Sequence, residues 1–456
     1  MNYWQKYLIK KLIRITPLYH RYRKKIIRLD KFNVSELQHV IKSIPYYRER
    51  GYERFANGYY PYLNKSEIIG KEEQLVSKKI SRIFLAKVST SGTSGKSLNI
   101  YKTISDVIKE EAFMQHAFSL IGKKLRIAVL RGNRPSCGIF EYKYGHLLLS
   151  SYHITQQNIL GYLKLIKKYK INCLHVYPSS FYLFCKYLQK AIRENGAELP
   201  AIKGILSSSE ILTSEMKNEI LKLFPEITLV DLYGQNEHVA FGLSINKGPY
   251  HFYDTYSVIE FLDTGFTTGK NKIKEIVGTN IYNKGMPLIR YRTEDFVEVD
   301  ESNNIVSILG RTNDFVVNKN KDIVPCIVAT RDNVFENVLL SQNYQEKIGE
   351  LVLRVQVNER FNDKDARNLE NDIAGCFQGL MQVKVQVVKN FDKTGNGKHI
   401  NLVQKLNLKE FGLVQKDEKE LHIPRNTAKW IQFLVKVLVF LYFEKVKHGL
   451  EFNNYL

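Results

Sequence analysis

The chain has 456 residues, of which 44% are hydrophobic and 25% are charged. These proportions are typical of a globular protein and exclude wholesale disorder. The 68 Lys and Arg residues outnumber the 46 Asp and Glu residues, so the formal net charge is +22. This excess favours an anionic partner: a nucleotide, a nucleic acid, an anionic membrane or an acidic polymer.

The cysteines and the apolar runs indicate the compartment. The five cysteines contain no CxxC pair, which argues against a disulfide scaffold and a structural zinc site. The N-terminal residues lack the pattern of a signal peptide, and no apolar run reaches the roughly 18 residues of a membrane span. We therefore expect a cytoplasmic protein.

Basic charge is concentrated at the two ends. Residues 1–29 hold nine basic residues and no acidic one, and their apolar residues have helical spacing that breaks near Pro17. This predicts a basic amphipathic segment that either lies on an anionic membrane surface or packs on the body of the protein. In the tail, residues 406–456, the stretch 430–443 has twelve apolar residues in fourteen and predicts a docking or interfacial helix. Peripheral attachment to the inner face of a membrane is one hypothesis that follows.

Between the ends, short apolar runs alternate with helical ones. The runs at 125–130, 171–177, 203–209 and 227–234 read as strands, with helical segments at 157–169, 180–196 and 214–224. This rhythm predicts an α/β fold with mixed, largely parallel sheets and flanking helices, and such sheets bind ligands beyond the carboxyl ends of their strands. We expect a large domain over 30–311. A smaller α+β pattern, with strands at 349–358 and 382–388 around a helix at 363–378, predicts a C-terminal domain over 312–405.

A glycine-rich loop follows the strand-like stretch 84–88. It reads STSGTSGK over residues 89–96 and leads into another strand-like stretch, so it does not have the Walker arrangement, in which a helix follows the loop. Its backbone N–H groups and hydroxyls can hold an anion, and Lys96 adds positive charge. Alone, the loop is equally consistent with an ordinary flexible turn.

Five segments in chain order resemble the motifs of the adenylate-forming superfamily of acyl-CoA synthetases and adenylation domains. They are TSGTSG (90–95), DLYGQNE (231–237), YRTED (291–295), GRTND (310–314) and KTGNGK (393–398). The stretches SSYHIT (150–155), SSSEIL (207–212) and MPLIRYRTED (286–295) resemble the phenylacetate–CoA ligase-like branch, and within it the CapK-like proteins of capsular polysaccharide loci.

The resemblance implies a role for each matching residue. Phosphates of ATP would be held by Thr90, Ser91, Gly92, Thr93, Ser94, Gly95 and Lys96. Ser208, Ser209 and Glu210 would line the adenine pocket, where Tyr233, with Gly234 beside it, would stack. Asp295 and Arg311 would contact the ribose, and Glu237 would hold Mg²⁺. Lys398, on a mobile small domain, would bridge the carboxylate and the α-phosphate as the catalytic lysine.

Each residue also has a structural interpretation. Asp295 could pair with Arg292, Tyr233 could end a strand, and Lys398 could be a solvated lysine in a turn. The chain departs from the family pattern at Glu294, which replaces a usual Gly, and at Asn313, which replaces an Asp. His116, His146, His175 and His251 have no acid–base or metal partner at recognisable spacing and are expected to be structural.

These residues imply an ATP-dependent enzyme that converts a small-molecule carboxylate into an acyl-adenylate and pyrophosphate. The acyl group would pass to CoA or another nucleophile, in capsular or other cell-surface polysaccharide biosynthesis. An alternative is an amide- or ester-forming ligase that acts on a sugar or lipid-linked precursor without acyl-CoA. A basic nucleic-acid-binding protein or membrane scaffold is the alternative of another class; the sequence contains no nucleic-acid-binding motif. The carboxylate pocket is expected between 137–155, 177–182 and 233–242.

Overall fold

The computed structural model describes residues 3–26, 38, 41–52, 60–89, 98–132, 135–136, 138–268, 270–280, 282–311, 315–321, 323–326, 335, 337–377, 379–392 and 399–407. The glycine-rich loop from Thr90 to Lys96, the predicted hinge 312–314, Lys398 and the tail from residue 408 lie outside these residues. Arg311 is described by its backbone alone.

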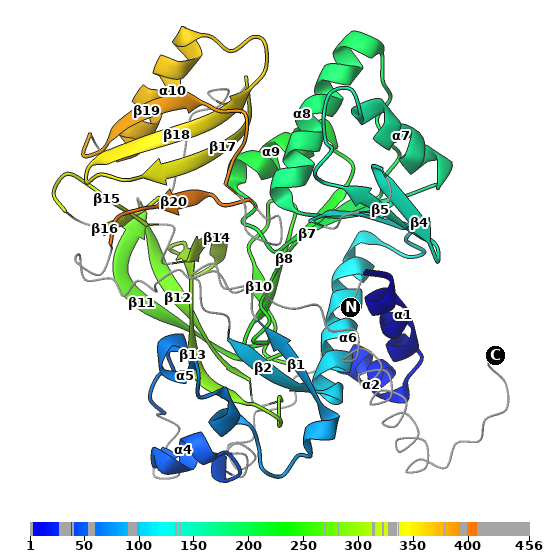
Figure 1. Cartoon of the computed structure of the whole chain (residues 1–456), viewed down its shortest axis with the longest axis vertical. Coiled ribbons are helices and arrows are strands. Elements are labelled where there is room, and N and C mark those ends of the chain that lie inside the picture. Colours follow the sequence, from blue (N-terminus) through cyan, green and yellow to red (C-terminus); the bar gives the residue numbers. More distant parts are fainter. Residues whose placement is uncertain are drawn as a thin grey trace.

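A mixed, largely parallel sheet of eight strands forms the centre of the molecule (Figure 1). The strand order is β10-β9-β8-β7-β6-β3-β5-β4, in which β5, β3, β6, β7 and β8 are parallel. The strands are β3 (Ile127–Arg131), β4 (Phe140–Lys143), β5 (His146–Ser150), β6 (Cys173–Val176), β7 (Gly204–Ser208), β8 (Thr228–Gly234), β9 (Phe241–Ile245) and β10 (His251–Phe252). This confirms the predicted fold class.

Helices cover both faces of this sheet. One face packs on α6 (Ile104–Ile121) and on the N-terminal helices α1 (Tyr3–Arg14) and α2 (Pro17–Lys25). The other packs on α7 (Ile159–Lys168), α8 (Pro178–Asn195) and α9 (Ser214–Leu223). Successive strand residues alternate between the two cores: Val129 lies in the first, and Leu130 in the second. Close packing requires Gly204 in β7, because a Cβ there would lie 2.2 Å from the carbonyl oxygen of Thr228.

The termini of the helices are fixed by local sequence. Thr103 and Asp106 form a capping box at the start of α6. In α8, Pro178 occupies the first turn and Gly196 ends the helix in the left-handed region with φ of 61°. Thr213 caps α9 through a hydrogen bond from the backbone N–H of Met216. These signals agree with the predicted helices 180–196 and 214–224, which correspond to α8 and α9, and the predicted helix 157–169 corresponds to α7.

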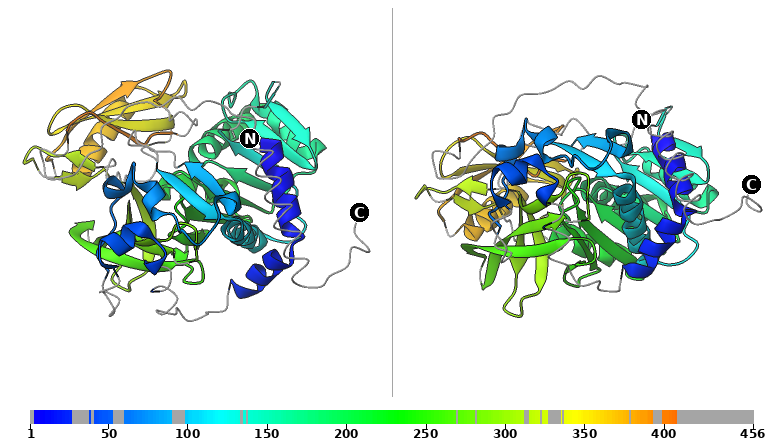
Figure 2. Two further views of the ribbon diagram at one scale, coloured as in Figure 1. Left: turned by 60° about the horizontal axis from the view of Figure 1, so that its bottom comes forward. Right: turned by 90° about the horizontal axis from the view of Figure 1, so that it is seen from below.

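The basic N-terminal segment packs on the body of the protein. Trp4, Tyr7, Ile9 and Ile13 of α1 are buried against the core that contains α6. On α6, Glu111 accepts a hydrogen bond from Arg14 at 2.7 Å and pairs with Lys10 at 3.1 Å. Figure 2 shows α1 and α2 along the outer edge of the molecule beside α6. Of the two alternatives for this segment, the structure therefore shows packing on the body.

After β8 the chain changes from parallel to antiparallel pairing. A four-stranded antiparallel sheet, β11-β12-β13-β14, is built from β11 (Val258–Thr268), β12 (Asn271–Asn280), β13 (Leu288–Val299) and β14 (Ile305–Arg311). The alternation of strands and helices that the sequence shows up to 227–234 therefore does not continue beyond β8. The register shifts between these strands interrupt the period-two pattern that would reveal them in the sequence.

Two smaller units complete the fold. The glycine-rich loop connects β1 (Leu85–Ser89) to β2 (Asn99–Thr103), which pair as an antiparallel hairpin. Four short helices precede this hairpin in the chain: α4 (Pro45–Glu49), α5 (Lys65–Ile68), η2 (Glu72–Leu75) and η3 (Arg82–Phe84).

The C-terminal part of the described chain, called here the small lobe, lies beside α8 (Figure 1). Its sheet has the order β19-β18-β17-β20 and is covered by α10 (Asp363–Cys376). The strands of this sheet are β17 (Val338–Gln345), β18 (Glu350–Val357), β19 (Gln382–Val387) and β20 (Leu402–Gln404). A separate antiparallel pair is formed by β15 (Phe315–Val317) and β16 (Ile323–Pro325). The two predicted strands and the predicted helix of this part correspond to β18, β19 and α10.

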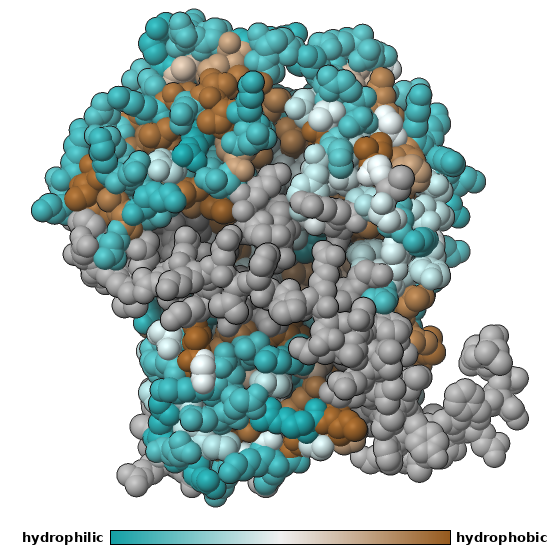
Figure 3. Space-filling view, viewed as in Figure 1, coloured by the Kyte–Doolittle hydropathy of each residue, from teal (hydrophilic) through white to brown (hydrophobic). Residues whose placement is uncertain are grey.

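Polar and apolar residues are both exposed on the face of the molecule seen in Figure 1. In the space-filling view, polar residues cover most of the outer rim, and a notch separates the small lobe from the region of α8 (Figure 3). Among the described helices, none combines the length and the apolar character that a membrane span needs.

Candidate functional site

Polar side chains meet where the parallel strands end. On the face that packs against α6, the core residues Val129, Cys173 and Leu206 are followed two positions later by Arg131, His175 and Ser208. Because side chains alternate along a strand, these three polar residues share one face at the carboxyl edge of the sheet. The structure therefore places the predicted Ser208 at the edge where an α/β sheet binds ligands.

Arg131 holds this group together. Its Nη2 donates to Ser209 Oγ at 2.7 Å, and its Nη1 lies 3.3 Å from His175 Nε2. The guanidinium also lies 4.8 Å from the ring centroid of Tyr177. Ser209 is exposed and takes up a left-handed conformation with φ of 74°, which is uncommon outside glycine and characteristic of sites under local constraint.

His175 is a neutral acceptor in this arrangement. Burial, followed by the nearby Arg131, lowers its pKa well below the ordinary value. Its Nε2 lies 3.2 Å from Ser208 Oγ as well as near Arg131. Arginine has only donors, so Nε2 must accept and the proton must lie on Nδ1. This agrees with the expectation that His175 is structural. The histidine contacts two polar residues of the site, Arg131 and Ser208.

A second pair joins β8 to the antiparallel sheet. Tyr233, near the end of β8, donates its hydroxyl proton to Asp295 Oδ2 in β13 at 2.6 Å. Asp295 is only 7% exposed, and its position pairs with Arg311 in the register of β13 and β14. Arg292 is held by Glu275 at 2.9 Å. The structure thus brings Tyr233, Asp295 and the backbone of Arg311 together and gives Arg292 a different carboxylate.

Glu237 lies just beyond β8 and is 5% exposed. Tyr291 Oη lies 3.4 Å from its carboxylate, and Lys102 of β2 is close enough for Glu237 to favour the charged form of the lysine. Lys102 Nζ is in turn 2.7 Å from His238 Nε2. Glu237 therefore lies between the end of β8 and the hairpin that carries the glycine-rich loop.

Glu210 connects the large sheet to the small lobe. Its Oε2 accepts hydrogen bonds from the backbone N–H of Ser179 at 3.1 Å and from the Ser179 hydroxyl at 2.7 Å. Its Oε1 accepts from the backbone N–H of His399 at 2.8 Å. This contact holds His399 beside the carboxyl edge of the sheet. His399 directly follows Lys398, the predicted catalytic lysine, in the sequence. The adenine-pocket role expected of Glu210 stays a prediction.

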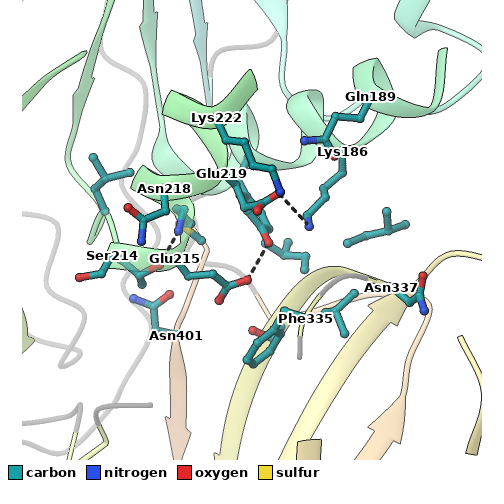
Figure 4. A pocket seen from close by; sticks show the side chains of 18 of the residues that line it. Lys186, Gln189, Ser214, Glu215, Asn218, Glu219, Lys222, Phe335, Asn337 and Asn401 are labelled. Atoms are coloured by element: carbon teal, nitrogen blue, oxygen red, sulfur yellow. Dashed lines mark hydrogen bonds and ion pairs between the residues drawn. The ribbon is translucent and has the colours of Figure 1, made fainter. Parts of the chain in front are cut away.

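Two cavities adjoin these residues. A cleft of about 1360 Å³ lies between α8, α9 and the small lobe. In Figure 4, Lys186 and Glu219 face each other from the two helices, and Phe335 and Asn337 form the opposite side. Lys186 and Glu219 pair at 3.7 Å.

The second cavity is smaller and lies in the region where the carboxylate pocket was expected. Its volume is about 340 Å³, and it is lined by Pro135, Gly138, Ser150, Tyr152 and His153. The lining residues fall in the expected segment 137–155 or next to it. No described residue of 177–182 or 233–242 lines it.

The sequence motifs miss Arg131. It belongs to none of the five motif segments, yet it contacts Ser209 and lies near the neutral His175. Its position directly after a buried apolar strand was the available signal, because such a residue lies at the binding edge of a parallel sheet. The described residues contain no cluster of three or more His, Cys, Asp or Glu that could hold a metal ion.

Comparisons with known proteins agree with this geometry. No protein-family model matches the chain. Protein CapK of Staphylococcus aureus is 25% identical over 333 residues, which cover 68% of this chain and 70% of that protein.

Among solved structures, 2-hydroxyisobutyryl-CoA ligase in the postadenylation state is similar in fold. Its complex with R3-HIB-AMP matches with a TM-score of 0.56 and 13% identity, covering 83% of this chain and 90% of the ligase. Its complex with 2-HIB-AMP matches with a TM-score of 0.53 and 12% identity, covering 89% of this chain and 91% of the ligase. The chain therefore has the fold of an adenylate-forming ligase.

Proposed function

The chain is a distant homologue of Protein CapK with an adenylate-forming, ligase-like fold, and from this premise we propose that it activates a carboxylate with ATP. The product of the first step would be an acyl-adenylate, with pyrophosphate as the leaving group. The observation that carries the proposal is the Tyr233–Asp295 pair, which forms at 2.6 Å between two sheets at the carboxyl edge. These two residues are the ones for which the resemblance implies adenine and ribose contacts.

The proposed chemistry needs positioning and charge stabilisation. A carboxylate oxygen attacks the α-phosphorus of ATP, and the bond from that phosphorus to the pyrophosphate oxygen breaks. Asp295, with Tyr233 donating to one of its oxygens, would accept hydrogen bonds from the ribose hydroxyls. Lys398 would stabilise the charge on the carboxylate and α-phosphate oxygens, and the glycine-rich loop would hold the outer phosphates.

Glu237 fits a role in holding Mg²⁺. Magnesium is usually bound by one or two protein carboxylates together with substrate phosphates, and it supplies charge neutralisation for the departing pyrophosphate. Glu237 is a buried carboxylate near the hairpin that carries the glycine-rich loop, which agrees with this pattern. It would share the ion with ATP rather than belong to a site made of protein ligands alone.

For the second step we infer transfer of the acyl group to CoA or to a hydroxyl or amine of a cell-surface polysaccharide precursor. The similarity to 2-hydroxyisobutyryl-CoA ligase supports CoA. The resemblance of its motifs to the CapK-like proteins of capsular polysaccharide loci favours a polysaccharide-related acceptor. Assays of acyl transfer to CoA, and to amino and hydroxy sugars, distinguish the two proposed acceptors.

The first step is tested by ATP–pyrophosphate exchange on a panel of carboxylic acids. We expect at least one acid to support exchange, and we expect Lys398→Ala to reduce the rate by a hundredfold or more. The matched control is Lys389→Ala, which removes an exposed lysine of the same lobe and should leave the rate within twofold. A Lys398→Ala variant that exchanges at the wild-type rate would contradict the assigned role of the lysine. Failure of every acid with folded protein would contradict the activity.

A further inference from the structure

Arg131 carries a positive charge for which the described residues offer no counter-ion. Its partners among the described residues are the Ser209 hydroxyl, the neutral His175 and Tyr177. No Asp or Glu of the described chain forms an ion pair with it within 4 Å, in contrast to Arg14, Arg290 and Arg292. Its Nε is buried and donates to no described acceptor.

Neighbouring groups increase the positive charge there. Burial, followed by Lys10 and then Arg131, lowers the pKa of Lys6 on α1. Arg131 also contributes to the lowered pKa of His175, as does Lys10. These effects place the first turns of α1 close to the end of β3, where Lys6 and Arg131 add positive charge and Glu111 offsets that of Lys10 through their ion pair. An isolated cation with an unsatisfied donor is unfavourable there unless an anion completes the site.

The chemistry of the side chain defines the missing partner. A guanidinium has five N–H groups in a planar fork that matches the two oxygens of a carboxylate or phosphate group. Here one N–H on Nη1 and one on Nη2 have described acceptors, Tyr177 adds a further hydrogen-bonding contact, and the buried Nε has no described acceptor. Neutral acceptors on the other side hold the fork in place, as a preorganised anion site requires.

Arg131 lies on the strand next to the smaller cavity, although it is not one of the residues that line that cavity. Arg131 pairs with Ser150 in the register of β3 and β5, and Ser150 lines the cavity of about 340 Å³. The same loop is tied to β3, because Ser151 donates to the carbonyl oxygen of Arg131 at 3.0 Å. A volume of this order accommodates a small organic acid.

We propose that the carboxylate activated by this protein bears a second acidic group, a carboxylate or a phosphonate- or phosphate-type group, and that Arg131 binds it. The inference rests on the proposed function and specifies its substrate class. One carboxylate would face the nucleotide and react, while Arg131 holds the other end of the molecule. A diacid is thereby oriented, and its monoacid counterpart lacks that contact.

The experiment compares matched acids in ATP–pyrophosphate exchange. Butanoate is compared with succinate and 3-phosphonopropanoate, and hexanoate is compared with adipate. We expect the diacid of a pair to have the higher kcat/KM. We expect Arg131→Gln to reduce the ratio of diacid to monoacid kcat/KM by about 10- to 100-fold, the usual effect of removing a hydrogen-bonded charge. Arg126→Gln, at the opposite end of β3 and exposed, should leave the ratio unchanged.

Several outcomes overturn the inference. A preference for monoacids does so, as does an Arg131→Gln variant with an unchanged ratio. A rise in the KM for ATP without a change in the ratio would assign Arg131 to the nucleotide instead. Arg131→Lys, which keeps the charge, provides a second variant if Arg131→Gln does not fold.

Loss of the proposed activity and loss of the Arg131 site give different results. If no acid of either kind supports exchange by folded wild-type protein, the proposed activity is wrong. Thermal unfolding in the presence of succinate, adipate or their monoacids then decides the Arg131 site. Stabilisation by the diacids that Arg131→Gln abolishes supports it, and equal behaviour of diacids and monoacids overturns it.

Discussion

At the scale of single residues, the site depends on contacts between groups far apart in the chain. Tyr233 and Asp295 are 62 positions apart and come from different sheets, yet they share a hydrogen bond of 2.6 Å. Gln235 donates to the same tyrosine hydroxyl at 3.2 Å. The tyrosine therefore restrains the carboxylate that we expect to receive the ribose hydroxyls.

Replacing Tyr233 by Phe tests this restraint. The variant keeps the ring and removes the hydroxyl that donates to Asp295, so the carboxylate loses a bond worth about 1 to 1.5 kcal/mol. We expect the KM for ATP in the exchange reaction to rise by roughly 5- to 10-fold. Tyr142→Phe, at an exposed position of β4, serves as the control. An unchanged KM for ATP in the folded Tyr233→Phe variant would show that the pair has no role in nucleotide binding.

Glu294 illustrates a departure from the family pattern that the structure clarifies. The residue has a φ of 59°, in the left-handed region where glycine is the least strained residue. The usual Gly at this motif position is consistent with that conformation. Glu294 takes up this conformation despite its side chain, and the strand presents Asp295 at the next position.

At the scale of elements, α6 combines an apolar face with buried charge. Lys109 donates to the carbonyl oxygen of Tyr256 at 2.6 Å and lies 3.8 Å from the ring centroid of Tyr282. Burial lowers its pKa to about 7, against the opposing effects of Asp106 and Glu110. Burial also raises the pKa of Asp106 to about 6. The charge state of this helix therefore changes near neutral pH.

A Lys109→Met variant should show a weaker dependence of stability on pH. The pKa of Lys109 is lower in the folded protein than in the unfolded chain, so the unfolded chain binds more protons between about pH 7 and pH 10. The lysine therefore makes the unfolding free energy rise with pH in this window. Urea unfolding at pH 7 and pH 9 should show that the variant loses roughly 1 to 2 kcal/mol of this rise.

The control for this experiment is Lys123→Met, at an exposed position just after α6. It should keep the wild-type difference between the two pH values. Parallel pH dependence of wild type and Lys109→Met would contradict the lowered pKa of the buried lysine.

The elements also show what sequence reasoning can reach. The parallel strands and α7 to α9 were predictable because apolar periodicity and capping residues are local signals. The antiparallel sheet β11–β14 was not, because bulges disturb its alternation. Arg131 was missed for a related reason. Its neighbours His175 and Ser209 are 44 and 78 positions away and meet it only through strand pairing and the loop after β7.

At the scale of the whole molecule, the contacts between the small lobe and the large sheet differ in their exposure to solvent. Glu210 accepts hydrogen bonds both from the start of α8 and from the backbone N–H of His399. Lys190 of α8 pairs with Glu359 of the small lobe at 2.7 Å, but both are more solvent-exposed. We infer that the first contact positions the small lobe and that the second adds little.

Glu210→Gln and Glu359→Gln compare these contacts directly. The first variant removes the carboxylate charge, and an amide offers one acceptor oxygen where the carboxylate offers two, so either Ser179 or His399 loses its partner. We expect kcat for exchange to fall by about 5- to 20-fold, with a larger radius of gyration in solution scattering. Glu359→Gln should stay within twofold of wild type. Equal effects of the two variants would contradict the positioning role of Glu210.

The proposed reaction begins with attack of a carboxylate on the α-phosphorus of ATP. The direct measurement uses an acid that supports exchange, labelled with ¹⁸O in its carboxylate, followed by mass spectrometry of the products after acyl transfer. An acyl-adenylate leaves its bridging oxygen on the nucleotide, so AMP should carry one ¹⁸O and pyrophosphate none. Label in inorganic phosphate with ADP as the nucleotide product, or AMP without label, would contradict the account.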